Sequence, residues 1–234
     1  NATVAESLKQ FADALETTES FESALHDLIQ KTIKEHRRII FNGNGYDDAW
    51  IKEATEVRGL LNLRTTPDAM PHLLDKKNVD MLTAHKVFTK AELESRYEIM
   101  LENYCKTVNI EALTMVDMAK KEILPAVEGY AKELSDAVIA KTTAVPGLAC
   151  KYDKSVITKL STLADEIDTA AAALESAANK YKTVEDVTEA SCMIRDVILQ
   201  KMAELRVVCD EAETVTAEKY WPFPTYEKLL FGVR

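Results

Sequence analysis

The chain has 234 residues, of which 47% are apolar, and a formal net charge of -10, so it is long enough to bury a core without disulfide or metal support. Only 6 glycines and 6 prolines occur, which argues against collagen-like, disordered and turn-rich all-β chains and favours helix. The acidic excess would repel phosphate backbones and anionic lipid surfaces, so neither nucleic acid nor membrane is an expected partner.

The first segment, residues 1–41, has the pattern of two amphipathic helices. Apolar residues recur every three or four positions from Val4 to Leu15 and again from Phe21 to Ile33, which is the spacing of one helix face. This pattern starts without a leading loop, so we expect the chain to begin inside a longer protein, as the continuation of a missing core. Neither a secretory signal nor a membrane-spanning run is recognisable.

Residues 42–88 are expected to form short helices and loops. The stretch RRIIFNGNGY at 37–46 ends the preceding helix in a tight loop, because two glycines follow a short apolar run. Its GNG at 43–45 resembles the start of a phosphate-binding loop, but the rest of GxGxxG or of a Gly-Lys-Ser/Thr motif is missing. A plain turn is therefore the simpler interpretation.

The same region carries two further helix signals. Residues 47–58 suit a short helix that Gly59 stops. Thr66 and Pro67 suit the cap and first residue of another short helix over 67–74.

Residues 89–145 should form a long helix. Thr89 and Glu92 have the spacing of a capping box, in which each side chain bonds the backbone N–H of the other residue. An apolar stripe then keeps helical spacing from Leu93 to Ala119. Pro125 is expected to kink or break this helix.

Residues 146–217 have the pattern of a long antiparallel helical hairpin. Apolar residues alternate three- and four-residue steps from Leu160 to Tyr181 and from Val187 to Ala212, as in a coiled coil or bundle. The joint between the two runs is too short for any packing other than antiparallel. The fold class is thus all-α, an elongated helical bundle with this hairpin and an irregular, aromatic and proline-rich tail at 218–234.

Catalytic motifs are not evident. The cysteines lack a CxxC pair and are interpreted as buried free thiols in a reducing cytoplasm, and the histidines lack HExxH spacing. Neighbouring acids, such as Glu53 with Glu56 or Glu211 with Asp210 and Glu213, fit solvated helix faces better than a metal or acid-base site. The cysteines are Cys105, Cys150, Cys192 and Cys209, and the histidines are His26, His36, His72 and His85.

The tail is the densest aromatic stretch of the chain, and its prolines forbid a continuous helix. Two interpretations stay open: the tail packs on the chain's own core, or it forms a subunit contact, since aromatic anchors are favoured at interfaces. The candidate interface residues are Tyr220, Trp221, Phe223, Tyr226 and Phe231.

Several stretches together resemble the C-terminal part of a type III bacterial glutamine synthetase, and their order and spacing match too. Between residues 128 and 217 the match rests mainly on helical periodicity. The stretches are RRIIFNGNGY at 37–46, RGLLNLRTTPDA at 58–69, SRYEIMLENYCKTVNIEALTM at 95–115, KKEILPAV at 120–127 and EKYWPFPTYEKLLF at 218–231.

The resemblance implies a cytoplasmic ligase of nitrogen metabolism that makes glutamine from glutamate and ammonia, using ATP with magnesium or manganese, and that assembles into stacked rings. In the family that it resembles, the catalytic acids and arginines lie upstream, and the final motif, an arginine followed by Gly-Ser-Ser, is absent here. We therefore expect no catalytic, cofactor-binding or metal residue in this chain, which is predicted to be inactive alone. Its expected role is to brace the catalytic core and the oligomer, with the rest of the enzyme and neighbouring subunits as partners.

Other hypotheses are kept. A stand-alone helical scaffold or interaction bundle would bind partner helices through an apolar groove, although such a bundle should begin with a cap and end in a polar terminus. The loop at 42–46 or the stretch NLRTT at 62–66 is also a candidate to reach over an active site of its own or a neighbouring subunit.

Overall fold

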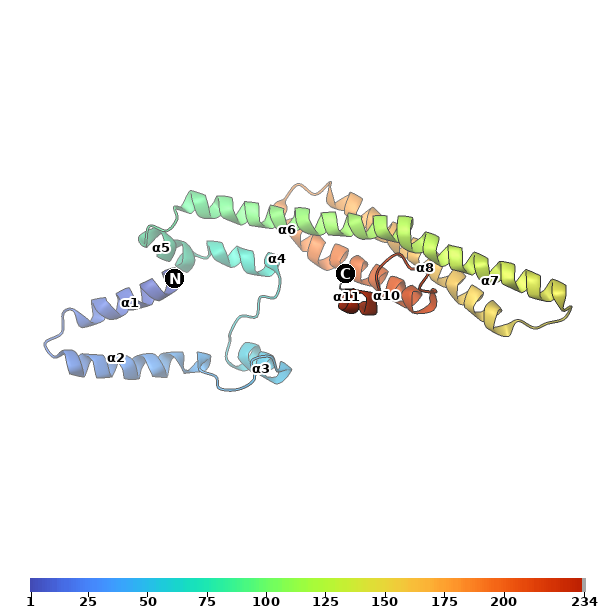
Figure 1. The fold of residues 1–234 in the computed structure, drawn as a ribbon. Helices are drawn as coiled ribbons and strands as arrows, with labels where there is room; N and C mark the ends of the chain where they lie inside the picture. The colour runs from blue at the N-terminus through green and yellow to red at the C-terminus, as the bar shows by residue number, and fades with distance from the viewer. Residues whose placement is uncertain (233–234) are drawn as a thin grey trace. The chain divides into compact units, whose positions relative to one another are not determined.

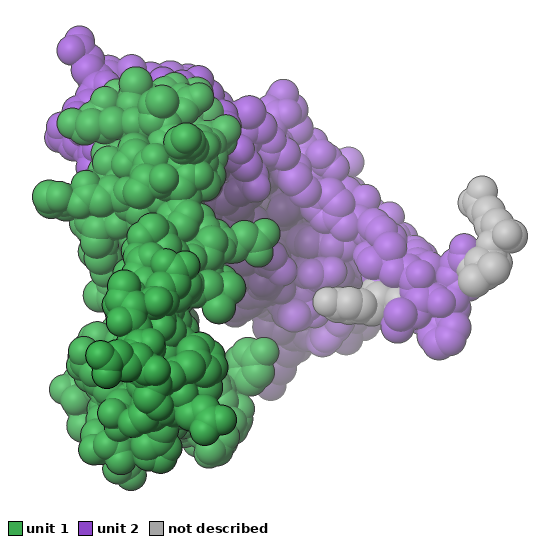
Figure 2. Space-filling view, turned by 90° about the vertical axis from the view of Figure 1, so that its left-hand side faces the viewer, with its two compact units in different colours: residues 1–100 green, residues 101–234 purple. Residues whose placement is uncertain are grey.

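The computed structural model describes residues 1–232, except for the side chain of Tyr226, and these residues contain helices and loops but no strand. The all-α prediction is therefore confirmed. The chain divides into two compact units, unit 1 with residues 1–100 and unit 2 with residues 101–234 (Figure 2). The five sequence segments proposed above remain a prediction about organisation.

Unit 1 is a succession of short and medium helices, as its sequence pattern predicts (Figure 1). The pattern did not resolve α5 as a separate helix. In chain order the elements are α1 (Ala2–Leu15), α2 (Phe21–His36), the 3-10 turn η1 (Arg37–Ile39), α3 (Asp48–Lys52), the π-helical turn η2 (Glu53–Val57), α4 (Thr66–Ala69), the 3-10 helix η3 (Met70–Leu74), α5 (Lys76–Ala84) and the first part of α6 (Lys90–Met118).

Helix starts in unit 1 follow capping chemistry. The backbone N–H of Thr89 donates to Glu92 Oε2 over 2.7 Å, and that of Glu92 donates to Thr89 Oγ1 over 3.3 Å, so the predicted capping box is confirmed. The predicted cap at Thr66 is one residue too late. Thr65 has the extended backbone of a cap, and its side chain accepts from Asp68 N, which leaves Thr66 inside the helix.

Unit 2 is built from three long helical runs. The first continues from α6 through the π turn η4 (Ala119–Ile123) into α7 (Leu124–Ala144), the second is α8 (Lys151–Tyr181), and the third is α9 (Val187–Met193) with the π turn η5 (Ile194–Ile198) and α10 (Leu199–Val215). Both α7 and α10 pack on α8, and a short joint after Tyr181 reverses the chain, which confirms the hairpin (Figure 1). A six-residue helix in the tail, α11 (Tyr226–Phe231), was not predicted.

Pro125 does not break the long helix. Helical structure runs without interruption from Lys90 to Ala144, and the wide turn η4 ends two residues before Pro125. In a regular α-helix the proline ring would clash with the carbonyl of Lys121. The π turn changes the local backbone spacing, so we attribute the continuity of this helix to η4.

The core of unit 2 lies along the apolar runs that the sequence pattern predicts for its long helices. Leu160, Leu163 and Ile167 of α8 are completely buried, as are Ile194 and Ile198 of η5. Trp221 and Phe223 of the tail are partly buried against this core. The apolar face of each long helix packs against another helix of unit 2. The sequence pattern therefore located this core correctly.

An ion pair between a half-exposed lysine and a buried carboxylate closes the turn between α7 and α8. Asp153 is 7% exposed, and both of its carboxylate oxygens accept from Lys141 Nζ over 2.9 Å. The carboxylate raises the pKa of Lys141. Gly147 takes a φ of 86° in this turn, a conformation that glycine adopts without steric cost.

Unit 1 has almost no core of its own. Only Pro67 and Leu93 are buried among its residues, all of which the structure describes. Large apolar side chains of α1 and α2 stay in contact with solvent, with Val4 and Leu8 each 62% exposed. A tie between α1 and α5 joins His85 Nε2 to Glu6 Oε2 over 2.7 Å.

The four cysteines are free thiols, as predicted, but only Cys105 and Cys209 are buried, while Cys150 and Cys192 are half-buried. Burial raises the pKa of Cys209 to about 11, so this thiol stays protonated at neutral pH. Across the described part of the chain, the helices are too short or too polar to cross a membrane.

Candidate functional site

The aromatic tail is fixed to α7 at Tyr220. Its hydroxyl donates to Glu133 Oε2 over 2.6 Å, and Lys219 Nζ reaches the same oxygen over 2.5 Å. These two hydrogen bonds, that from Lys219 foremost, lower the pKa of Glu133. The tail is therefore anchored by a charged and hydrogen-bonded contact.

A glycine on α7 makes room for this anchor. The Tyr220 ring lies 5.7 Å from the ring of Tyr130, measured between centroids. A Cβ atom at Gly129 would stand 3.2 Å from two carbons of the Tyr220 ring, which is tighter than ordinary van der Waals contact. Glycine in a helix costs about 1 kcal/mol relative to alanine, and here it permits the close approach of the tail.

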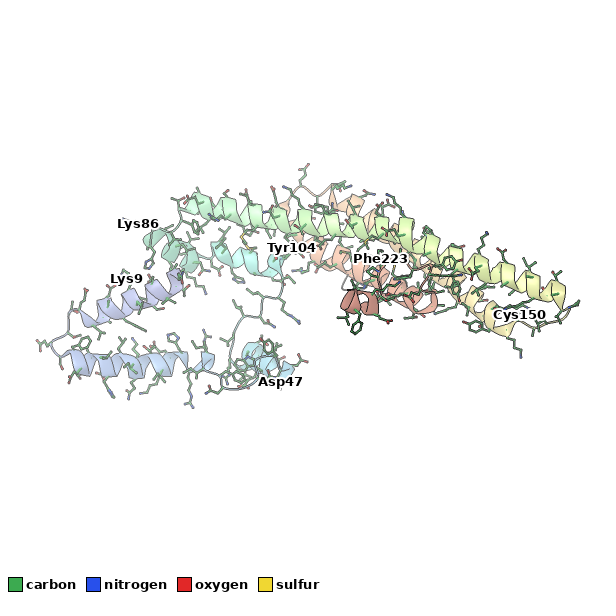
Figure 3. All side chains as sticks on the ribbon, viewed as in Figure 1. Lys9, Asp47, Lys86, Tyr104, Cys150 and Phe223 are labelled. Carbon is green, nitrogen blue, oxygen red and sulfur yellow. The ribbon has the colours of Figure 1, made fainter. Side chains whose placement is uncertain are left out.

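Beyond the anchor, Trp221 and Phe223 line a shallow groove of unit 2. Their rings meet edge to face, with centroids 6.1 Å apart and an interplanar angle of 77°, a favourable aromatic geometry. The groove has a cavity volume of about 300 Å³, and Phe223 is labelled in Figure 3. Its other lining residues are Met115, Met118, Ile123, Leu205, Arg206, Cys209, Asp210 and Glu213.

The five predicted interface residues thus have different surroundings. Tyr220, Trp221 and Phe223 pack against unit 2, which is the arrangement of the own-core alternative. Phe231 of α11 is 79% exposed. The side chain of Tyr226 lies outside the described part of the structure. Whether any of them contacts another subunit stays a prediction.

A second organised surface lies in unit 1 and is centred on Arg58, which the sequence analysis did not single out. Phe41 and Trp50 stack with centroids 3.7 Å apart, and the Arg58 guanidinium lies 4.8 Å from the Trp50 ring. The same guanidinium donates to the carbonyl of Ile40 over 2.9 Å and to Glu53 Oε1 over 2.6 Å. This network orders the chain around the loop without a buried core.

The loop at 42–46 is a turn, as the simpler interpretation predicted. Asn44 Oδ1 accepts from the Tyr46 N–H over 3.1 Å, and the Asn44 carbonyl accepts from the Asp47 N–H over 3.3 Å. A Cβ at Gly43 would approach the Phe41 ring to 2.6 Å, which accounts for glycine there. Tyr46 projects from this loop with 95% of its surface exposed.

Three of the five acidic residues considered as pairs are bonded to basic side chains. Glu53 bonds to Arg58, Asp210 accepts from Arg206 Nε over 2.8 and 2.9 Å, and Glu211 pairs with Lys159. Among the described residues, no group of three or more His, Cys, Asp or Glu side chains is placed to hold a metal ion. The residues present therefore do not fit a divalent metal centre.

Together these features define an all-α protein with two ordered surface regions: an anchored aromatic tail with its groove, and an ordered loop on a unit with little core. Comparison with known proteins supplies the family. Residues 24–142 match the family model of the glutamine synthetase C-terminal domain. The chain belongs to this family.

The relatives support this assignment over nearly the whole chain. A glutamine synthetase of Butyrivibrio fibrisolvens is 38% identical over 89% of this chain and 30% of its own length. The type-3 glutamine synthetase of Dictyostelium discoideum is 28% identical over 99% of this chain and 32% of its own length, and a glutamine synthetase of Bacteroides fragilis is 25% identical over 99% and 33%. The chain thus spans about a third of the length of the curated relatives that it matches.

Proposed function

We propose that this chain is the C-terminal helical domain of a cytoplasmic type III glutamine synthetase, which ligates ammonia to glutamate with ATP and magnesium or manganese. The nucleotide, the metal and the catalytic residues belong, in this proposal, to the two thirds of the enzyme outside the matched region. The domain itself braces that catalytic portion and the ring-shaped oligomer. The family match and the lack of a metal-binding group among the described residues support this division of labour.

The observation that carries the bracing role is the exposed apolar surface of unit 1. Val4, Leu8 and Phe21 are 62%, 62% and 58% exposed, and they belong to amphipathic helices without buried residues. Contiguous exposed apolar surface marks a contact site with another protein surface. Covering it with the catalytic portion or a neighbouring subunit would stabilise both partners by removing apolar area from water.

The test uses the full-length enzyme that contains this chain. We expect Val4→Ser with Leu8→Ser to lower its melting temperature and to promote dissociation of the oligomer, measured by calorimetry and light scattering. The matched control is Ile139→Ser with Val207→Ser in unit 2, where the native side chains are 64% and 65% exposed. Equal behaviour of both double variants would contradict the bracing role of the unit 1 surface.

The location of the chemistry has a separate test. The 234-residue chain alone should show no ligase activity and no thermal stabilisation by Mg-ATP, whereas a ligand that binds only the folded state raises the melting temperature. A clear rise of the melting temperature with Mg-ATP would refute the assignment of nucleotide binding to the rest of the enzyme.

A further inference from the structure

Two Asn-Gly dipeptides follow one another in the loop at 42–46. The first is Asn42-Gly43 and the second is Asn44-Gly45, and all four residues are exposed. Asparagine before glycine is especially prone to deamidation, because glycine has no Cβ to hinder attack by its own backbone nitrogen on the asparagine side chain. Since the two dipeptides are identical, the structure around each of them is what can separate their reactivities.

The first glycine lies against an aromatic stack. A Cβ atom at Gly43 would stand 2.6 Å from Cζ of Phe41, so the backbone of Gly43 rests on this ring. Phe41 in turn stacks on Trp50 with centroids 3.7 Å apart, and the Arg58 guanidinium lies 4.8 Å from the Trp50 ring. Closing a five-membered ring between Asn42 and Gly43 requires the backbone to rotate there, and the stack opposes this rotation by steric contact.

The second glycine has free space around it. Apart from its chain neighbours, a Cβ atom at Gly45 would meet no heavy atom within 4 Å, so the backbone can turn there without a clash. The side chain of Asn44 is also bent back over this peptide, because its Oδ1 accepts from the Tyr46 N–H over 3.1 Å in an Asx turn. This hydrogen bond polarises the Cγ–Oδ1 bond and makes Cγ more electrophilic.

We propose that Asn44 is a site of spontaneous deamidation and that the Phe41–Trp50 stack protects Asn42 from the same reaction. The Gly45 nitrogen loses its proton to hydroxide and bonds to Asn44 Cγ, the Cγ–Nδ2 bond breaks, and Nδ2 leaves as ammonia with a proton from water. Water then opens the resulting succinimide at either carbonyl, which gives aspartate or isoaspartate at position 44. The reaction needs no oxidant or reductant, and it is independent of the bracing role.

Either product changes what the loop presents to its surroundings. A carboxylate at position 44 adds a negative charge close to those of Asp47 and Asp48. In isoaspartate the main chain runs through the former side chain, which lengthens the backbone by a methylene and removes the acceptor of the Tyr46 N–H. Tyr46 is 95% exposed, so its ring would move with this backbone. The modification therefore alters both the charge and the shape of an exposed surface.

The experiment incubates the 234-residue chain at mildly alkaline pH and follows both sites by mass spectrometry. The tryptic peptide of residues 39–52 contains both asparagines, and its fragment ions distinguish them. We expect Asn44 to deamidate about tenfold faster than Asn42, a small part of what fixed orientation can contribute to a rate. In urea the two rates should become equal, because the stack and the Asx turn are lost. Asn44→Gln should abolish the fast reaction and leave the slow one at Asn42.

The protective role of the stack has its own variant. Phe41→Ala removes the ring beside Gly43 and should raise the rate at Asn42 to that at Asn44, whereas the control Phe21→Ala, at a side chain of α2 that is 58% exposed, should change neither rate. An unchanged rate at Asn42 in the Phe41→Ala variant would overturn this role. Equal rates in the folded native chain, or a faster reaction at Asn42, would overturn the whole proposal, and this comparison depends on no variant.

Discussion

Unit 2 and unit 1 contain helices with the same kind of apolar periodicity, yet only unit 2 converts it into a core. In unit 2 the apolar faces of α7 and α10 pack against α8, and Leu163 and Ile198 are completely buried. In unit 1 the stripes of α1 and α2 remain exposed, and order comes from caps, the Phe41–Trp50–Arg58 stack and the Glu6–His85 tie. Amphipathic spacing therefore specifies which side of a helix will be covered, but not which molecule covers it.

The largest expected effect tests this difference directly. Leu163→Ala should destabilise unit 2 by about 3 kcal/mol, because it leaves a cavity in a closely packed core. The matched change Leu8→Ala in unit 1 should alter the stability of the isolated chain by less than about 0.5 kcal/mol. Urea unfolding followed by circular dichroism measures both, and similar losses for the two variants would remove the distinction between the units.

A second test concerns the ion pair that closes the turn between α7 and α8. Asp153→Asn should cost about 2 kcal/mol, because the buried Asp153 carboxylate loses its charge-assisted hydrogen bonds to Lys141. Asp136→Asn is the control, since Asp136 lies 3.9 Å from Lys132 at the surface with 66% of its side chain exposed. The folded-state pKa of Lys141 is raised above its ordinary value of 10.5. The stability that this ion pair contributes is therefore fully present below pH 10.5 and is lost as the pH rises through the folded-state pKa.

A third test addresses the attachment of the tail. Gly129→Val should displace the Tyr220 ring and cost about 1–2 kcal/mol through overpacking, with a shift in the fluorescence of the neighbouring Trp221. Gly129→Ala should come close to neutral, since about 1 kcal/mol of gained helix propensity opposes a contact that a small ring movement relieves. Unchanged fluorescence in the valine variant would mean that the tail does not rest on α7.

The smallest effect is expected at the start of α6. Thr89→Ala should reduce local stability by about 1 kcal/mol, the usual cost of losing a cap, and should speed amide exchange in the first turn. The Thr89 backbone N–H is the main cause of the lowered pKa of Glu92. The contribution of this contact is therefore present above the ordinary value of 4.5 and fades as the pH falls through the lower folded value. Exchange rates that do not respond to either change would argue against the capping box.

The sequence located those features whose determinants are local or periodic. The Thr89–Glu92 box, the hairpin and the seam from Leu160 to Tyr181 follow from spacing alone, because their partners lie nearby or repeat along a helix. The network of Arg58 was missed because two of its acceptors are the backbone carbonyls of Arg38 and Ile40, which leave no side-chain pattern.

The tail shows the same difference between local features, which a sequence pattern can reveal, and long-range contacts, which it cannot. Its anchoring role was suggested by aromatic density, but Glu133 as the acceptor lies 87 residues from Tyr220 in the chain and no spacing rule identifies it. The helix α11 was obscured by Pro222 and Pro224. The usable signal was Thr225, whose hydroxyl caps the helix at Lys228.

The π turn η4 makes the long helix sensitive to the number of residues within it. Residues before it place Ala112 and Val116 in the core, and residues after it place Val127 and Leu134 there. Each residue of an α-helix advances the side chains by about 100°. The π turn holds one residue more than an α-helical turn, so deleting a single residue from η4 would return the segment to regular α-helix and keep Val127 and Leu134 facing α8. Inserting a further residue there would instead turn the rest of that helix by about 100° and should be far more harmful than the deletion.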